Sequence, residues 1–183
     1  MRLFLIAFIL FVAVAATADD QVGFEENYVL YEGETDNFII DAPDHWYIDI
    51  ENASKDGYTA AIFADTESYN DPSMIIYVWV YHKDSLSFQE FISEDSAYYI
   101  KRDAALTVAS ADTVLTDQGK TAVVFEMENP GMGSETAAIG YIDAGPEIVI
   151  YELDVRRLDH FLEGNYNFRE AIWLFKVVGK ETE

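Results

Sequence analysis

The fold class of this chain is decided by the nine residues MIIYVWVYH, which run from Met74 to His82. Most of them are β-branched or aromatic, and turn-forming residues bound them at 70–73 and 83–85, which is typical of a β-strand. Successive strand residues point to opposite faces of a sheet, and both faces of this stretch are apolar. Because both faces need cover, we expect an interior strand in a sheet with helices on both sides.

Two amphipathic segments are predicted to supply that cover. The segment 85–105 is expected to be a helix, because Ser87 and Glu90 have the spacing of a capping box. A second helix is expected near the C-terminus, with Asn167 as its N-cap. The apolar positions at helical spacing are Phe88, Phe91, Ile92, Tyr99 and Leu106 in the first segment, and Phe168, Ala171, Ile172, Leu174, Phe175 and Val178 in the second.

The remaining apolar segments are short and are separated by turn signals. After the first helix, three predicted strands (120–128, 136–143 and 147–155) are joined by short turns, and short turns force antiparallel pairing. Before it, strands are expected at 28–31, 37–41, 46–50 and 59–64. The predicted class is therefore α+β, with an antiparallel sheet sandwiched between helices (α/β/α).

Several of these segments together resemble the PsbP-like fold. The similarity rests on FIIDAPDHW at 38–46, the strand 75–81, LSFQEF at 86–91, GKTA at 119–122 and a final helix rich in Phe and Ile. It covers roughly Asp36 to Val178, and His45 stands where the family more often has glycine. The resemblance implies an antiparallel sheet between helices, and it implies a protein that acts by binding partners.

Residues 1–18 have the pattern of a secretory signal peptide. Met1-Arg2 precedes an apolar run at 3–16, and Ala16-Thr17-Ala18 is a small-x-small cleavage site. An uncleaved anchor is the alternative, but the run is shorter than the ~20 residues that span a bilayer. We therefore expect an exported protein, periplasmic or extracellular and of bacterial type, with 19–183 as a single PsbP-like domain and no membrane span after cleavage. The chain has no cysteine.

Charge is the strongest compositional signal. The chain has 34 acidic and 11 basic residues, a formal net charge of −23. Such a surface disfavours nucleic acid, whose binding depends on Lys and Arg, and it disfavours anionic membranes for the same reason. It indicates either a cationic partner or a saline habitat, where counter-ions screen the self-repulsion.

One loop carries a candidate metal site. Asp65, Glu67 and Asp71 offer the hard oxygen ligands that Ca²⁺ prefers, so weak Ca²⁺ binding is a hypothesis for this loop. A solvated acidic loop is the alternative, since the spacing is not that of an EF-hand. No other cofactor is expected.

Candidate ligand- or partner-binding residues are scattered along the chain. They are Trp46, Tyr47, Tyr98, Arg156, Arg157 and His160. Aromatic residues could instead belong to the core, and the two arginines could form local ion pairs with Asp154 or Asp159. Two histidine–carboxylate sites are further alternatives, one of His82 with Asp84 and one of His45 with Asp41 and Asp44.

No sequence motif of a known catalytic class is present. The leading hypothesis is an exported, non-enzymatic binding or interaction module, with a protein or small-molecule partner in the cell envelope. A periplasmic hydrolase or metal-dependent enzyme is one alternative, and a calcium-responsive surface protein is another.

The charge excess makes a prediction about salt. If the acidity is an adaptation to a saline habitat, raising NaCl from low to molar levels will screen the repulsion and markedly raise the melting temperature. Thermal melting at a series of NaCl concentrations measures this. A flat response would contradict the habitat explanation.

Overall fold

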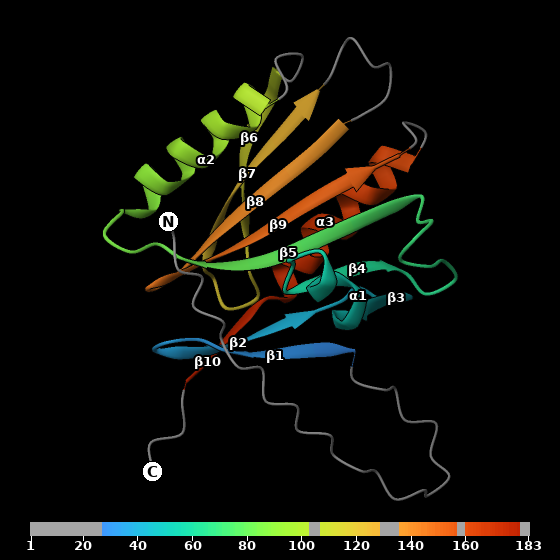
Figure 1. Ribbon diagram of the computed structural model, residues 1–183, viewed down its shortest axis with the longest axis horizontal. Coiled ribbons are helices and arrows are strands. Elements are labelled where there is room, and N and C mark those ends of the chain that lie inside the picture. The colour runs from blue at the N-terminus through green and yellow to red at the C-terminus, as the bar shows by residue number, and fades with distance from the viewer. Residues whose placement is uncertain (1–26, 103–106, 129–135, 157–159, 180–183) are drawn as a thin grey trace, which may run out of the picture.

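The computed structural model describes residues 27–102, 107–128, 136–156 and 160–179, so the expected signal peptide lies outside the described residues. Its order of elements is β1 (Tyr28–Glu32), β2 (Asp36–Asp41), β3 (Trp46–Asp49), α1 (Ile50–Lys55), β4 (Ala60–Ala64), β5 (Met74–His82), α2 (Phe88–Arg102), β6 (Thr107–Leu115), β7 (Thr121–Glu128), β8 (Thr136–Ala144), β9 (Glu147–Val155), α3 (Phe161–Leu174) and β10 (Lys176–Gly179). The described part is mostly sheet (Figure 1).

A seven-stranded antiparallel sheet forms the body of the molecule. Its strand order is β3-β4-β5-β9-β8-β7-β6. The β5 strand lies inside this sheet and pairs with β9 along its whole length, from Met74 opposite Val155 to His82 opposite Glu147. The prediction that residues 74–82 form an interior strand is therefore confirmed.

One face of the large sheet packs on α3. Met74, Ile76 and Val78 of β5 lie in the same buried cluster as Phe168 and Ile172 of α3, and at most 4% of the surface of each is exposed. Fully burying one such side chain contributes about 1.5–3 kcal/mol. Alternate side chains of β5 therefore point toward α3, as expected for a strand whose successive residues face opposite sides of the sheet.

The opposite face packs partly on α2. Phe88 and Ile92 of α2 contact a cluster that includes Trp79 of β5 and Tyr141 of β8. The Tyr141 hydroxyl also donates a hydrogen bond of 2.8 Å to Asp95 Oδ2 of α2. Burial raises the pKa of the Asp95 carboxyl, and the hydrogen bond from Tyr141 acts in the opposite direction. These contacts dock α2 over the β7–β8–β9 part of the sheet.

A second, three-stranded sheet has the order β1-β2-β10. Phe38 and Ile40 of its central strand are fully buried in the cluster that contains α3, and the ring centre of Phe38 lies 5.9 Å from that of Phe175. This sheet therefore shares one side of the large sheet with α3, and sequence analysis did not predict it. The α+β class and the antiparallel sheet are confirmed, whereas a sheet simply sandwiched between helices stays a prediction.

The helix boundaries differ from those expected. The first long helix begins at Phe88, after a capping box in which Ser87 N donates to Glu90 Oε2 (2.9 Å) and Glu90 N to Ser87 Oγ (3.3 Å). The choice of Asn167 as an N-cap is wrong, because α3 begins at Phe161 and the Asn167 side chain donates to the Glu163 carbonyl within the helix. Val178, assigned to that helix, lies in β10.

Three short or exposed elements were not predicted. The α1 helix follows a strand directly, and its cap is Asp49, whose Oδ1 accepts from Asn52 N at 2.8 Å. The β6 strand lies at the edge of the sheet and is exposed at almost every position, so it carries no alternating pattern. The β10 strand is only four residues long.

Gly140 tests how closely α3 packs on the sheet. A Cβ atom at this position of β8 would lie 2.6 Å from Ile172 Cδ1 and 3.3 Å from Phe168 Cζ. We expect Gly140→Ala to lower the free energy of unfolding by about 1–3 kcal/mol, the usual cost of overpacking a core. Urea denaturation measures this difference.

The matched control is Gly179→Ala. A Cβ atom there would meet no atom within 4 Å, so its free energy of unfolding should stay within about 0.5 kcal/mol of the parent value. Equal effects of the two substitutions would show that α3 does not pack on β8 as described.

Candidate functional site

The connection between β2 and β3 carries a strained residue. Trp46 N donates to the Pro43 carbonyl (3.1 Å) and closes a turn, and Asp65 N donates to the His45 carbonyl (2.9 Å). Within this turn His45 has a φ of +66°, a left-handed conformation that costs a non-glycine residue roughly 1–2 kcal/mol. Strain of this kind is often found at functional sites.

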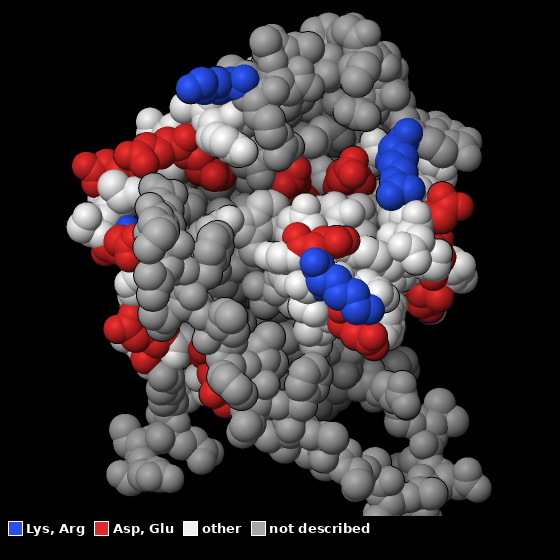
Figure 2. Space-filling view, in the orientation of Figure 1, with Lys and Arg blue, Asp and Glu red and all other residues white. Residues whose placement is uncertain are grey.

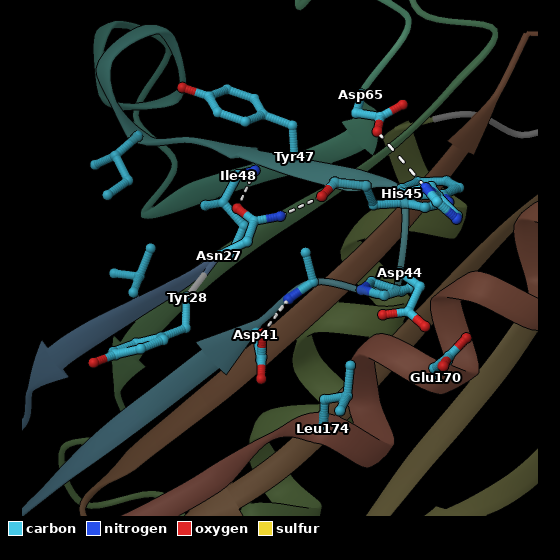
Figure 3. A pocket seen from close by; sticks show the side chains of 15 residues that line it. Asn27, Tyr28, Asp41, Asp44, His45, Tyr47, Ile48, Asp65, Glu170 and Leu174 are labelled. Carbon is cyan, nitrogen blue, oxygen red and sulfur yellow. Dashed lines mark hydrogen bonds and ion pairs between the residues drawn. The ribbon is translucent and has the colours of Figure 1, made fainter. Parts of the chain in front are cut away.

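A pocket of about 910 Å³ opens beside this turn. Its walls come from the start of β1, the end of β2, β3, the loop after β4 and one side of α3 (Figure 3). The lining residues are Asn27, Tyr28, Val29, Asp41, Ala42, Pro43, Asp44, His45, Trp46, Tyr47, Ile48, Ile50, Asp65, Glu170 and Leu174. Its volume is in the range of small-ligand sites, roughly 300–1,000 Å³.

Asn27 joins the two sheets at this pocket. Its Nδ2 donates to the Trp46 carbonyl and its Oδ1 accepts from Ile48 N at 3.1 Å (Figure 3). β3 is an edge strand of the large sheet. The Asn27 side chain therefore hydrogen-bonds backbone groups of β3 that would otherwise be available to pair with a strand of another chain. A ligand in the pocket would therefore meet mainly side chains.

The pocket is strongly acidic. Four of its lining residues carry carboxylates, Asp41, Asp44, Asp65 and Glu170, and its described lining contains no Lys or Arg. The one ionisable base is His45, whose Nδ1 lies 3.9 Å from Asp65 Oδ2. Both of these side chains are largely exposed, so the pair contributes little to stability. The lining therefore favours a cationic ligand.

Aromatic rings add flat apolar surfaces to the acidic groups. Tyr47 is 51% exposed, and its ring packs edge-on against Phe63, with the centroids 5.8 Å apart. Tyr28 is also exposed, whereas Trp46 is 7% exposed and belongs to the core. The face of an aromatic ring can bind an ammonium or guanidinium group, and Tyr28 and Tyr47 bring such rings to the pocket lining.

Position on α3 explains why Glu170 faces the pocket. Its neighbour Arg169 points to the other side of the helix, where Nη1 lies 3.1 Å from Asp112 Oδ2 and Nη2 lies 3.1 Å from Glu126 Oε1. These ion pairs hold α3 to β6 and β7. Figure 3 shows Glu170 and Leu174 projecting from α3 on the side of the turn that carries Asp44 and His45.

The structure brings some of the predicted site residues together. Trp46 and Tyr47 line the pocket together with Asp65. Tyr98 is 60% exposed on α2, away from the pocket lining. The remaining predicted residues are Arg156, whose Nη1 lies 3.7 Å from Asp71 Oδ1, His160, whose Nδ1 lies 3.8 Å from Glu163 Oε2, and Arg157, which lies outside the described residues.

The three carboxylates proposed for Ca²⁺ have separate partners. Asp65 faces His45, Glu67 Oε2 accepts from Ser73 N at 3.0 Å, and Asp71 faces Arg156. They do not form a three-ligand group among the described residues. Ca²⁺ binding by this loop stays a prediction.

Sequence reasoning missed the residues that complete the pocket. Asn27 directly precedes β1, and Glu170 lies within α3. No local pattern identifies either residue, because both reach the pocket through contacts between distant segments. The sequence did point to this region through Trp46, Tyr47 and Asp65, and through the alternative site of His45 with Asp41 and Asp44, all of which line the pocket.

None of the helices in the described ranges has the length and apolarity needed to cross a membrane.

Comparisons with known proteins support the fold. No protein-family model matches the chain, and no curated protein matches it by sequence. The solution structure of cyanobacterial PsbP (CyanoP) from Synechocystis sp. PCC 6803 is similar, with a TM-score of 0.54 and 13% sequence identity over 88% of this chain and 98% of that one. The chain therefore has a PsbP-like fold, as its sequence indicated.

The strain at His45 can be measured by two substitutions. We expect His45→Gly to be more stable than His45→Ala by about 1 kcal/mol, because only glycine adopts the left-handed conformation without steric cost. Chemical denaturation of the two variants gives this difference directly.

Asp117 serves as the control position, since it lies in an exposed turn and its φ is not positive. There the order should reverse, with Asp117→Ala more stable than Asp117→Gly by about 0.4–1 kcal/mol. The same order at both positions would mean that His45 is not strained.

Proposed function

We propose that this protein is an exported, non-enzymatic binding module whose acidic pocket binds a Lys- or Arg-bearing segment of a partner protein. The observation that carries the proposal is the charge of the lining: four carboxylates and no Lys or Arg among its described residues. Such a cavity raises the local concentration of cations. The chain's net charge of −23 acts in the same direction at longer range.

The shape of the pocket favours a side chain on an extended segment. Apolar groups from Val29, Pro43 and Leu174 line it together with the carboxylates. A lysine or arginine has an apolar stem and a charged head, so it can contact both kinds of surface. The exposed faces of Tyr28 and Tyr47 provide cation–π contacts for the head group.

Export is the second part of the proposal. It is supported by the signal-peptide pattern of residues 1–18. Acidic side chains are distributed over the visible face of the molecule, where Lys and Arg are few (Figure 2). A basic partner would therefore be attracted before it reaches the pocket.

The arrangement of layers bears on access to the pocket. We infer that α2 and α3 are the outer layers on the two sides of the large sheet, supported by the separate clusters that each helix enters. In that arrangement the pocket lies at the β3 edge, where only one side of α3 borders it. An extended segment can enter from this edge without moving either helix.

Binding of a lysine-rich peptide tests the proposal. We expect saturable binding by isothermal titration calorimetry, and no binding of a glutamate-rich peptide of equal length. The double substitution Asp44→Asn with Asp65→Asn, or Glu170→Gln, should weaken binding by about twofold to fivefold for each charge removed, the usual range for exposed ion pairs. Affinity should also fall as salt rises.

The matched control is Glu94→Gln. Glu94 is an exposed acid on α2 that does not line the pocket, so this substitution changes the net charge by as much as Glu170→Gln does and should leave the affinity almost unchanged. Equal weakening by this control would assign the attraction to overall charge. Equal binding of spermidine and the peptide would show that the pocket selects small cations instead of a protein segment.

A further inference from the structure

A second group of polar side chains gathers at a different junction of the two sheets. Glu34 lies in the turn between β1 and β2, His82 ends β5, and Glu147 begins β9. A carboxylate oxygen of each glutamate and a ring nitrogen of the histidine lie within 4.8 Å of one another. None of the three lines the pocket described above.

The fold fixes this proximity through the backbone. His82 and Glu147 are directly opposite each other in the β5–β9 ladder. The backbone N–H of Glu34 donates to Glu147 Oε1, which ties the β1–β2 turn to the large sheet. In Figure 1 this turn, the end of β5 and the start of β9 lie at the same end of the molecule. A site of His82 with Asp84 was one alternative from the sequence; in the structure His82 Nδ1 lies 3.3 Å from Glu34 Oε2.

Glu147 has an unsatisfied requirement for a partner. It is only 5% exposed, and its Oε2 is buried without a hydrogen-bond partner among the described residues. A buried carboxylate is costly unless it is paired with a charge or bound to a metal ion. Its charge also reaches the nearby Tyr31, whose pKa is raised first by burial and then by Glu147.

We propose that Glu34, His82 and Glu147 form a binding site for a divalent first-row transition metal ion, for which Zn²⁺ is the probe. One imidazole nitrogen with carboxylate oxygens is a donor set that Zn²⁺ accepts, and three protein ligands leave a position for water. Ca²⁺ and Mg²⁺ prefer oxygen ligands alone. His82 and Glu34 are about half exposed or more (48% and 64%), so an ion can reach the site from solvent.

Such an ion would join the two sheets. Glu34 belongs to the turn of the small sheet, whereas His82 and Glu147 belong to adjacent strands of the large one. Because the three ligands come from separate segments, unfolding would disperse them, so binding and folding are coupled. A bound ion therefore stabilises the folded protein, and the stabilisation grows with the logarithm of the free ion concentration above Kd.

Zinc titration of the purified, chelator-treated protein tests the site. We expect one equivalent of Zn²⁺ to bind by calorimetry, and the melting temperature to rise by about 5 °C or more at a hundredfold excess over Kd. His82→Gln and Glu147→Gln should each weaken Zn²⁺ binding by more than about tenfold, since even the loss of a second-shell partner costs that much. Glu34→Gln, at an exposed position, provides a third variant should Glu147→Gln fail to fold.

The matched control is His160→Gln. Nδ1 of His160 also lies near a carboxylate, 3.8 Å from Glu163 Oε2, but it belongs to no three-ligand group in the described ranges. Its Zn²⁺ affinity should equal that of the parent. Binding that is unchanged in His82→Gln, or that is equally strong for Ca²⁺ and Zn²⁺, would overturn the proposal and assign the metal to the scattered surface acids. The absence of saturable Zn²⁺ binding would also overturn it.

The proposals for the metal site and for the peptide pocket can be tested independently of each other. Because they share no residue, the variants at 34, 82 and 147 should leave binding of the lysine-rich peptide intact. The variants at 44, 65 and 170 should likewise leave Zn²⁺ binding intact.

Discussion

The pairing of β5 with β9 is the constraint on which the remaining architecture depends. These nine-residue strands lie side by side within the large sheet, and both faces of β5 and one face of β9 are mainly apolar. Each buried apolar side chain contributes about 1.5–3 kcal/mol only while it stays covered. One face is covered by α3 together with the small sheet, and the other is partly covered by α2. The apolar side chains of residues 74–82 therefore need the cover of α3 and the small sheet. This packing holds in place the elements that form the pocket.

Sequence reasoning recovered this part of the fold because the signal is local. Strands buried on both faces show as continuous apolar runs, and the sequence places distinctive turn-forming residues between the segments that form β7, β8 and β9. It failed where the pattern was weak or absent. The β6 strand is exposed along nearly its whole length, and α1 follows β3 without a break. The small sheet could not be foreseen, since β2 pairs with β10, which lies more than a hundred residues later in the chain.

The candidate sites were harder to predict for a related reason. With 34 acidic residues in the chain, almost any segment offers carboxylates, so their presence in a segment carries little information. Trp46, Tyr47 and Asp65 were identified because they lie in or near recognisable strands and turns. Asn27 and Glu170, in contrast, reach the pocket from distant parts of the chain. Likewise the sequence offered Asp84 only as one alternative partner of His82, and it is the β5–β9 register that places His82 opposite Glu147. Spatial arrangement, not composition, distinguishes these carboxylates from the rest.

The two candidate sites have a common structural origin. The small sheet is attached to the rest of the molecule at its centre by apolar contacts of Phe38 and Ile40, but near its ends by polar ones. At one end the Asn27 side chain binds the backbone of β3; at the other the Glu34 backbone binds the Glu147 carboxylate. Apolar packing alone would leave the backbone groups at these ends without partners, and buried polar groups require partners. Polar side chains at such junctions are fixed by the fold while remaining partly open to water, and this combination suits a binding site. The same junctions that align the two sheets therefore present the groups through which each site would select its cation.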